Sequence, residues 1–224
     1  MIVIVFGIIM GIVHYFSNAL RAKCKLFESQ VISFSAGVAI TYIFLELFPQ
    51  FSLGVANLNN SPFLFVLLGF VLIHVVEKEL YQHVPRSKLK KDLAIEASAV
   101  SFVYHFIIGI IAVSLISQGL VNGILFFIPI LLYTGVSTLP VKQARSKQIK
   151  LIVASSTLLG TLFGLYILTP MSQILHLSLL GLLIGVLSYS SIRHSIPIGK
   201  KGNPLFFVLG VLFYTIILFM GGFI

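Results

Sequence analysis

The sequence predicts an all-α integral membrane protein with eight transmembrane helices in a three-two-three inverted-repeat arrangement and both termini outside the cytoplasm. Three observations lead to this fold class: the composition, the alternation of basic loops with loops that lack Lys and Arg, and an apolar motif that recurs in opposite membrane directions. Hydrophobic residues make up 58% of the 224 positions and charged residues only 9%. Because soluble domains carry roughly 25% charged residues, this chain cannot cover a water-facing surface, and residues 1–224 form a single transmembrane domain.

Eight apolar segments are each close to the length of a membrane span. A helix needs about 20 mostly apolar residues to cross the hydrocarbon core. Each segment must be helical there, because an unpaired backbone group in lipid costs several kcal/mol. The predicted helices cover residues 1–19, 30–49, 62–80, 95–117, 120–140, 148–169, 174–192 and 204–224, and we expect the connector 77–92 to be solvated.

The basic residues orient the chain. All 15 Lys and Arg residues lie in four regions, 21–25, 78–91, 142–150 and 193–201, which follow the first, third, fifth and seventh segments. The alternate loops and both tails have none. Since Lys and Arg mark cytoplasmic loops, both termini lie outside, and we expect the protein in the plasma (inner) membrane. The net charge of +9 is confined to these loops, so nucleic-acid binding is not expected.

One motif occurs twice, early and late in the chain. Residues 37–49 read GVAITYIFLELFP and residues 185–197 read GVLSYSSIRHSIP, with Glu46 and His194 at the same place in the motif. The second and seventh spans run in opposite directions, so the repeat is inverted. Secondary transporters are often built from inverted repeats, with the binding site near the bilayer midplane. The alternative interpretation is a chance recurrence of Gly, Pro and aromatic residues in apolar sequence.

Two ionisable residues within predicted spans are candidates for function, because burying a charge in the membrane is expensive. His105 lies nearest a bilayer midplane, where an imidazole can ligate a metal or relay a proton. Its alternative role is to donate to a neighbouring carbonyl. Glu46 is the acid within a predicted span, near its outer end. It either attracts cations in an outer vestibule or simply reaches the outer headgroups.

Other polar residues extend these candidates into a path. Ser101 and Tyr104 flank His105 in the fourth segment, and the fifth segment carries Tyr133, Thr134, Ser137 and Thr138. Pro129 is expected to open the fifth helix locally and free backbone carbonyls as ligands. A cytoplasmic exit is a further hypothesis, with ordinary interfacial histidines as its alternative; its residues are His14, His74 and His194.

No catalytic motif is present in the sequence. It lacks Gly-x-Ser-x-Gly, His-Glu-x-x-His, paired intramembrane aspartates and a phosphate-binding glycine loop. An enzyme is therefore not expected, and no cofactor is assigned.

Motifs in three segments resemble the ZIP (zinc/iron permease) family of metal transporters. The second segment is similar to the family pattern Phe-x-Ala-Gly-Val followed by an acidic or His residue, two apolar residues and Pro, here Phe34–Val38 and Glu46–Pro49. The third and seventh segments resemble its Leu-Gly-Phe…Glu-Lys and Gly-x3-Tyr…Glu-x2-Pro patterns, here Leu68–Phe70 with Glu77–Lys78, and Gly185, Tyr189, His194 and Pro197. The resemblance implies eight spans and uptake of a divalent metal such as zinc into the cytoplasm.

The fourth and fifth segments depart from the family. Its metal-binding patterns there are His-Asn-x-x-Glu-Gly and His-Asn-Ile-Pro-Glu-Gly, whereas this chain keeps His105, Gly109 and the pair Ile128-Pro129. Apolar residues replace the carboxylate ligands, and zinc prefers several N, S or O ligands. The expected partners are the lipid bilayer and a metal ion as substrate, and a homodimer is left open.

Two alternatives to metal transport stay open: a scaffold or subunit without metal transport, and transport of a different substrate. Water between the fourth and fifth segments would favour transport. Filling of this space by Phe106, Phe126 and Phe127 would favour the scaffold.

Overall fold

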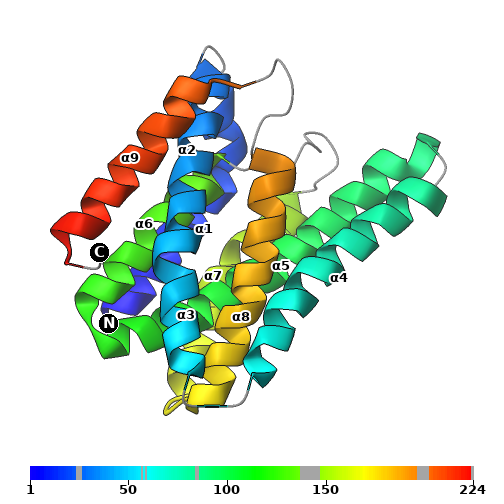
Figure 1. Cartoon of the computed structure of the whole chain (residues 1–224). Coiled ribbons are helices and arrows are strands. Elements are labelled where there is room, and N and C mark those ends of the chain that lie inside the picture. The colour runs from blue at the N-terminus through cyan, green and yellow to red at the C-terminus, as the bar shows by residue number, and fades with distance from the viewer. Residues whose placement is uncertain are drawn as a thin grey trace.

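The computed structural model describes residues 1–23, 27–56, 58, 60–83, 86–136, 147–195 and 202–222, without the side chains of 18–23, 80, 86–94, 96–97 and 194–195. Within these ranges every regular element is a helix, as predicted (Figure 1). The α-helices are α1 (Ile2–Lys23), α2 (Glu28–Tyr42), α3 (Phe48–Val55), α4 (Ser61–His83), α5 (Arg86–Gln118), α6 (Leu120–Val136), α7 (Lys147–Tyr166), α8 (Gln173–Ser190) and α9 (Pro204–Met220). Two π-helical turns complete them, η2 (Ile43–Leu47) and η3 (Ser191–Ser195).

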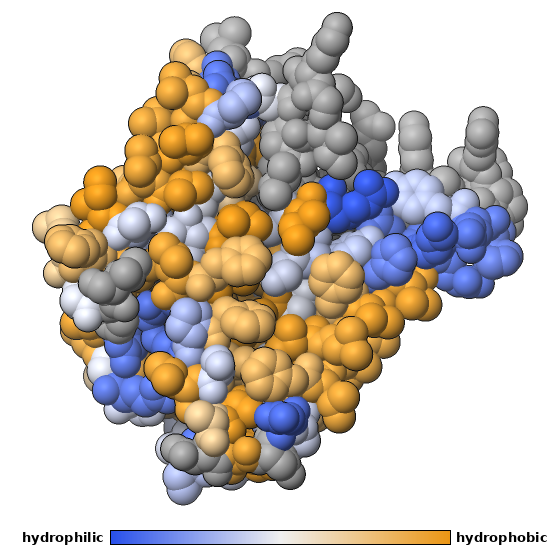
Figure 2. All heavy atoms as spheres, viewed as in Figure 1, coloured by the Kyte–Doolittle hydropathy of each residue, from blue (hydrophilic) through white to orange (hydrophobic). Residues whose placement is uncertain are grey.

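Four helices are long and apolar enough to cross a membrane by length and composition. They cover Glu28–Val55, Ser98–Gln118, Lys147–Tyr166 and Gln173–Arg193. Shorter apolar helices cover Ile2–Ser17, Leu120–Val136 and Pro204–Met220. Apolar residues dominate the face shown in Figure 2. Hydrophilic side chains gather where the α4–α5 hairpin projects from the rest of the bundle. This distribution fits a membrane protein.

The two π turns occupy equivalent places in the repeated motif. The turn η2 joins α2 to α3, and η3 extends α8. When Gly37 is aligned with Gly185, residues 43–47 and 191–195 coincide. A π turn holds one residue more than a regular α-helical turn and is often found at functional sites. The helix from Glu28 therefore passes through Pro49 and continues to Val55, beyond the predicted end of the second segment.

Glycines allow α2 and α9 to pack with their backbones in contact. A Cβ atom on Gly37 would overlap the carbonyl oxygen of Phe207, and a Cβ atom on Gly210 would overlap that of Phe34. The pair α4 and α8 repeats this arrangement with Gly185 against Val66 and Gly69 against Leu182. When Gly37 is aligned with Gly185, and Gly210 with Gly69, the contacted residues align as well. Phe207 then corresponds to Val66, and Phe34 corresponds to Leu182.

The two helix pairs run in opposite directions (Figure 1). The backbone N–H of Asn203 donates to Ser33 Oγ at 3.0 Å, so α2 and α9 begin at the same end of the bundle. The side chain of Gln173, at the start of α8, donates to the carbonyl of Gly54 in α3 at 3.3 Å. The start of α8 therefore lies beside the end of the helix that contains α2, and the two helices are antiparallel.

The sequence predicts a solvated connector at 77–92; the described residues of this stretch are helical, although most of those between 78 and 83 are exposed. The helix α4 continues to His83, and α5 already begins at Arg86. Glu77 is only 7% exposed. The hydropathy of the sequence marks the part of each helix that suits hydrocarbon, and residues such as Lys, Glu and Leu then extend the helix into water because they are good helix formers.

A third close crossing brings together the helices that carry the candidate site. A Cβ atom on Gly160 of α7 would overlap the carbonyl oxygen of Phe106 in α5. Gly11 of α1 likewise faces the carbonyl of Ala154 in α7. The helix α7 therefore holds both α1 and α5 at short range, which positions their polar side chains against each other.

Candidate functional site

The centre of the candidate site is His105, which is 5% exposed on α5. Its Nδ1 lies 2.7 Å from the carbonyl oxygen of Ser101, one turn earlier in the same helix. A carbonyl can only accept, so this nitrogen carries the proton and donates. Its Nε2 lies 3.1 Å from the hydroxyl of Thr134 in α6, which donates to the neutral ring. The interaction with a neighbouring carbonyl that the sequence allowed is thus present.

A second imidazole, that of His14 in α1, stacks on the first. The ring centroids of His14 and His105 are 4.5 Å apart, with an angle of 20° between the ring planes. His14 Nδ1 lies 3.2 Å from the carbonyl oxygen of Val153, and its Nε2 lies 3.3 Å from the hydroxyl of Ser101. The hydrogen bonds therefore give both rings the same tautomer, with Nδ1 donating to a carbonyl and Nε2 accepting from a hydroxyl.

This arrangement offers two imidazole nitrogens and two hydroxyl oxygens. Nitrogen and oxygen ligands of this kind suit zinc and other transition metals. Stacked rings place their in-plane lone pairs side by side and do not make them converge, so a shared ion requires one ring to turn. No group of three or more His, Cys, Asp or Glu side chains lies together among the residues that the structure describes. Water or a counter-ion would have to complete the coordination.

The tyrosines of the predicted path are buried near this pair. The ring of Tyr104 meets His105 edge-on, with centroids 4.9 Å apart, and its buried hydroxyl has no hydrogen-bond partner in the described part of the chain. Tyr133 is buried in α6. Ser137 and Thr138 lie outside the residues that the structure describes.

Pro129 acts differently from the prediction. The helix α6 is continuous from Leu120 to Val136 and does not open at the proline. Because proline has no N–H, the carbonyl of Leu125 loses its partner within the helix. The hydroxyl of Tyr214 in α9 donates to that carbonyl at 2.7 Å. The carbonyl is freed, as expected, but a side chain already occupies it.

Glu46 lies inside the π turn η2 and is 4% exposed. The side-chain amide of Gln50, one turn later, donates to its carboxylate. The helix bundle therefore encloses this side chain, which does not extend to the protein surface as the alternative required.

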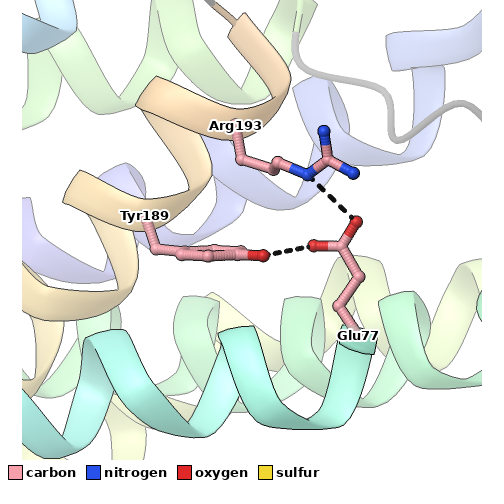
Figure 3. Close-up of polar contacts among 3 residues, drawn as sticks. All are labelled: Glu77, Tyr189 and Arg193. Atoms are coloured by element: carbon pink, nitrogen blue, oxygen red, sulfur yellow. Dashed lines mark hydrogen bonds and ion pairs between the residues drawn. The ribbon is translucent and has the colours of Figure 1, made fainter. Parts of the chain in front are cut away.

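A buried ionic cluster joins α4 to the end of α8 (Figure 3). The hydroxyl of Tyr189 donates to Glu77 Oε2 at 2.6 Å, and Arg193 Nε lies 3.4 Å from Glu77 Oε1. Sequence reasoning missed this cluster because it placed Glu77 beside a loop. The spacing of Tyr189 and Arg193, one turn apart, is the signal that could have indicated a shared partner.

The three histidines of the predicted exit have different surroundings. His14 stacks on His105, whereas the exposed His74 meets the ring of Tyr189 edge-on at 5.8 Å. The side chain of His194 lies outside the described residues.

Aromatic side chains fill the space beside the site. Phe126 is 2% exposed, Phe127 stacks on Phe6 at 4.3 Å, and Phe106 packs on Phe163 at 5.5 Å. The void that remains next to Phe126 and Phe127 has a volume of about 10 Å³. A cavity of this size holds about one water molecule. The region is packed in this conformation.

The sequence matches no family model and no curated protein.

Proposed function

We propose that this chain is a ZIP-like membrane transporter that moves a divalent transition-metal cation, such as zinc, into the cytoplasm. The observation that carries the proposal is the stacked pair of His14 and His105, which joins α1 to α5 inside the bundle. Residues Ser98–Gln118 form one of the helices suited to a membrane, so His105 lies within a span. Imidazoles at such a depth are expensive to bury and are typical of a substrate or proton path.

The architecture supports a transporter of the inverted-repeat type. The pairs α2–α9 and α4–α8 share glycine contacts at equivalent positions and run in opposite directions. Such halves can rock against each other around a site between them. With the alternation of basic loops, this symmetry supports eight spans with both termini outside.

In this proposal the two Nε2 atoms bind the ion. Without the ion, the hydroxyls of Thr134 and Ser101 donate to these nitrogens. When the ion binds, the hydroxyl hydrogens turn away from the nitrogens, and the hydroxyl oxygens become further ligands. Glu46 serves the outer part of the path. His74 and His194 serve its cytoplasmic exit, and Arg193 directly precedes His194 in the sequence.

A second candidate, a scaffold or complex subunit without metal transport, is favoured by the packing. Phe126, Phe127 and their neighbours leave a void of about 10 Å³, and two imidazoles are a small ligand set. Transport requires this region to open in another conformation, whereas a scaffold does not.

The test is zinc uptake into proteoliposomes by the unchanged chain and by His14→Ala, His105→Ala and His83→Ala. His83 is an exposed imidazole at the end of α4 and serves as the matched control. We expect uptake by the unchanged chain and by His83→Ala, and its loss in the other two variants. Normal uptake by His105→Ala would remove the site assignment. No uptake by the well-folded unchanged chain would favour the scaffold.

A further inference from the structure

A large apolar cavity lies between α4, α5 and α8, and Tyr104 is part of its lining. Among the described side chains its volume is about 630 Å³, within the range of ligand-binding pockets. Among the side chains that the structure describes, its lining is apolar apart from Tyr104 and includes Leu72, Val76, Val100, Val103, Leu183 and Val186.

The rim of the cavity faces outward. Leu72, Val76 and Val103 are exposed by 48%, 41% and 53%, and Ile95 by 54%. In a helix bundle embedded in lipid, such side chains meet hydrocarbon. The cavity therefore opens toward the lipid phase, from which its occupant can enter.

We propose that this cavity binds an acyl chain of an anionic phospholipid, whose headgroup phosphate is held by Arg193 and Lys78. The described walls offer water a single polar side-chain group, the hydroxyl of Tyr104, whereas a buried water needs roughly two to four partners. An empty cavity would forfeit the dispersion contacts of all its lining atoms. A flexible hydrocarbon chain fills an irregular apolar space and is the most abundant apolar group around a membrane helix.

The charged residues at one end of the contact between α4 and α8 determine which lipid headgroup binds. Val76 is followed by Glu77, which pairs with Arg193, and by the exposed Lys78. Arg193 is half exposed and meets Glu77 Oε1 through Nε at 3.4 Å, and its guanidinium carries two further donor nitrogens (Figure 3). Those nitrogens can bind a phosphate in a bidentate manner without breaking the existing contact.

The sequence around this end adds to the positive charge. Residues 77–96 contain five Lys or Arg residues and four acids, and one of these acids, Glu79, lies 2.9 Å from His83. Basic clusters beside transmembrane helices recognise anionic headgroups. A zwitterionic lipid would gain less from this end, since its own ammonium group opposes the cations.

The experiment is native mass spectrometry of the purified full chain with added dioleoyl phosphatidylglycerol or dioleoyl phosphatidylcholine. Ala99→Phe places a bulky ring in the cavity and obstructs an acyl chain there, because Ala99 lines it. The double variant Lys78→Gln/Arg193→Gln removes the headgroup site. Matched controls are Val121→Phe, on an exposed position of α6, and Lys147→Gln/Lys150→Gln, at the start of α7.

We expect the unchanged chain to bind phosphatidylglycerol about tenfold more tightly than phosphatidylcholine, as a charge-assisted phosphate contact allows. Ala99→Phe should lose both lipids, and the double variant should bind both equally. The controls should behave as the unchanged chain. Equal binding of both lipids by the unchanged chain would overturn the headgroup assignment, and lipid retained by folded Ala99→Phe would overturn the cavity assignment.

A second measurement uses the unchanged chain alone, so it tests the proposal even if a variant does not fold. Phosphatidylglycerol with a photoreactive diazirine in its acyl chain should label peptides of α4, α5 and α8 in the unchanged chain. Labelling confined to other helices would overturn the proposal. Neither assay contains zinc, so the outcome is independent of metal transport.

Discussion

Among individual side chains, the carboxylate of Glu77 is buried and is held by two partners. It is 7% exposed, and its two oxygens meet the hydroxyl of Tyr189 and the guanidinium of Arg193. A buried charge is tolerated only where it is paired and hydrogen-bonded. The cluster therefore stabilises the contact between α4 and the end of α8. It lies just beyond the stretch in which glycines let these two helices touch.

Replacing Tyr189 by Phe removes the hydroxyl from this carboxylate and leaves one oxygen without that donor. We expect a loss of about 1–3 kcal/mol in the free energy of unfolding, measured by denaturant titration in detergent micelles. Tyr81→Phe is the control, since Tyr81 is 51% exposed in the same helix α4. Equal stability of Tyr189→Phe and the control would show that the hydrogen bond contributes nothing.

The contact between Tyr214 and the carbonyl of Leu125 can be tested with Pro129. Tyr214→Phe alone should lower the free energy of unfolding by about 1–3 kcal/mol, because the carbonyl is left buried and unpaired. In the Pro129→Ala background the new N–H can bond that carbonyl within the helix. We therefore expect Tyr214→Phe to cost less there, and the double-mutant cycle measures the difference. Strict additivity would refute the link between the two residues.

At the scale of helices, the glycine contacts determine how closely α2 approaches α9 and how closely α4 approaches α8. Gly37 and Gly185 face carbonyl oxygens of the neighbouring helix at equivalent positions. Small residues at such crossings let backbones pack without intervening side chains. The helices of the two pairs therefore pack in the same way at their equivalent glycines.

Gly37→Ala and Gly185→Ala should each lower the free energy of unfolding by about 1–3 kcal/mol, because the added methyl group forces the helices apart. The two losses should be similar, since the contacts are equivalent. Gly119→Ala is the control, because its nearest neighbour would lie at 3.7 Å. Thermal unfolding monitored by circular dichroism compares the three variants; a large loss in only one of the first two would contradict the equivalence.

At the scale of the whole molecule, the antiparallel helix pairs and the alternating loops define one topology. Gln173 at the start of α8 reaches Gly54 near the end of α3, so these two ends share one side of the bundle. The sequence around these two ends, residues 51–61 and 167–173, contains no Lys or Arg. The proposed orientation places this side outside the cytoplasm.

Cysteine labelling tests that topology. In a Cys24→Ser background, Asn60→Cys and Gln118→Cys should react with a membrane-impermeant maleimide in intact cells. Lys147→Cys, and Cys24 in the unchanged chain, should react only after permeabilisation. Labelling of Lys147→Cys in intact cells would contradict the proposed number of spans or their orientation.

Much of the fold is readable from local sequence. The 58% of hydrophobic residues requires helices that suit a membrane, and the repeated Gly-Val motif marked the two helices that later show π turns at equivalent positions. Helix ends were less predictable. Hydropathy predicted an end at Pro49, but the helix continues to Val55 because the π turn accommodates the proline.

The sequence by itself determined the helical class, the membrane character, the repeated motif and the candidate His105. Each depends on composition or on spacing along one helix. Only the tertiary structure decided that His14 stacks on His105, that Glu77 is buried with Tyr189, and that Tyr214 takes the carbonyl freed by Pro129. These contacts depend on how each helix is rotated and how closely it crosses its neighbour, and the side chains of many residues set both at once.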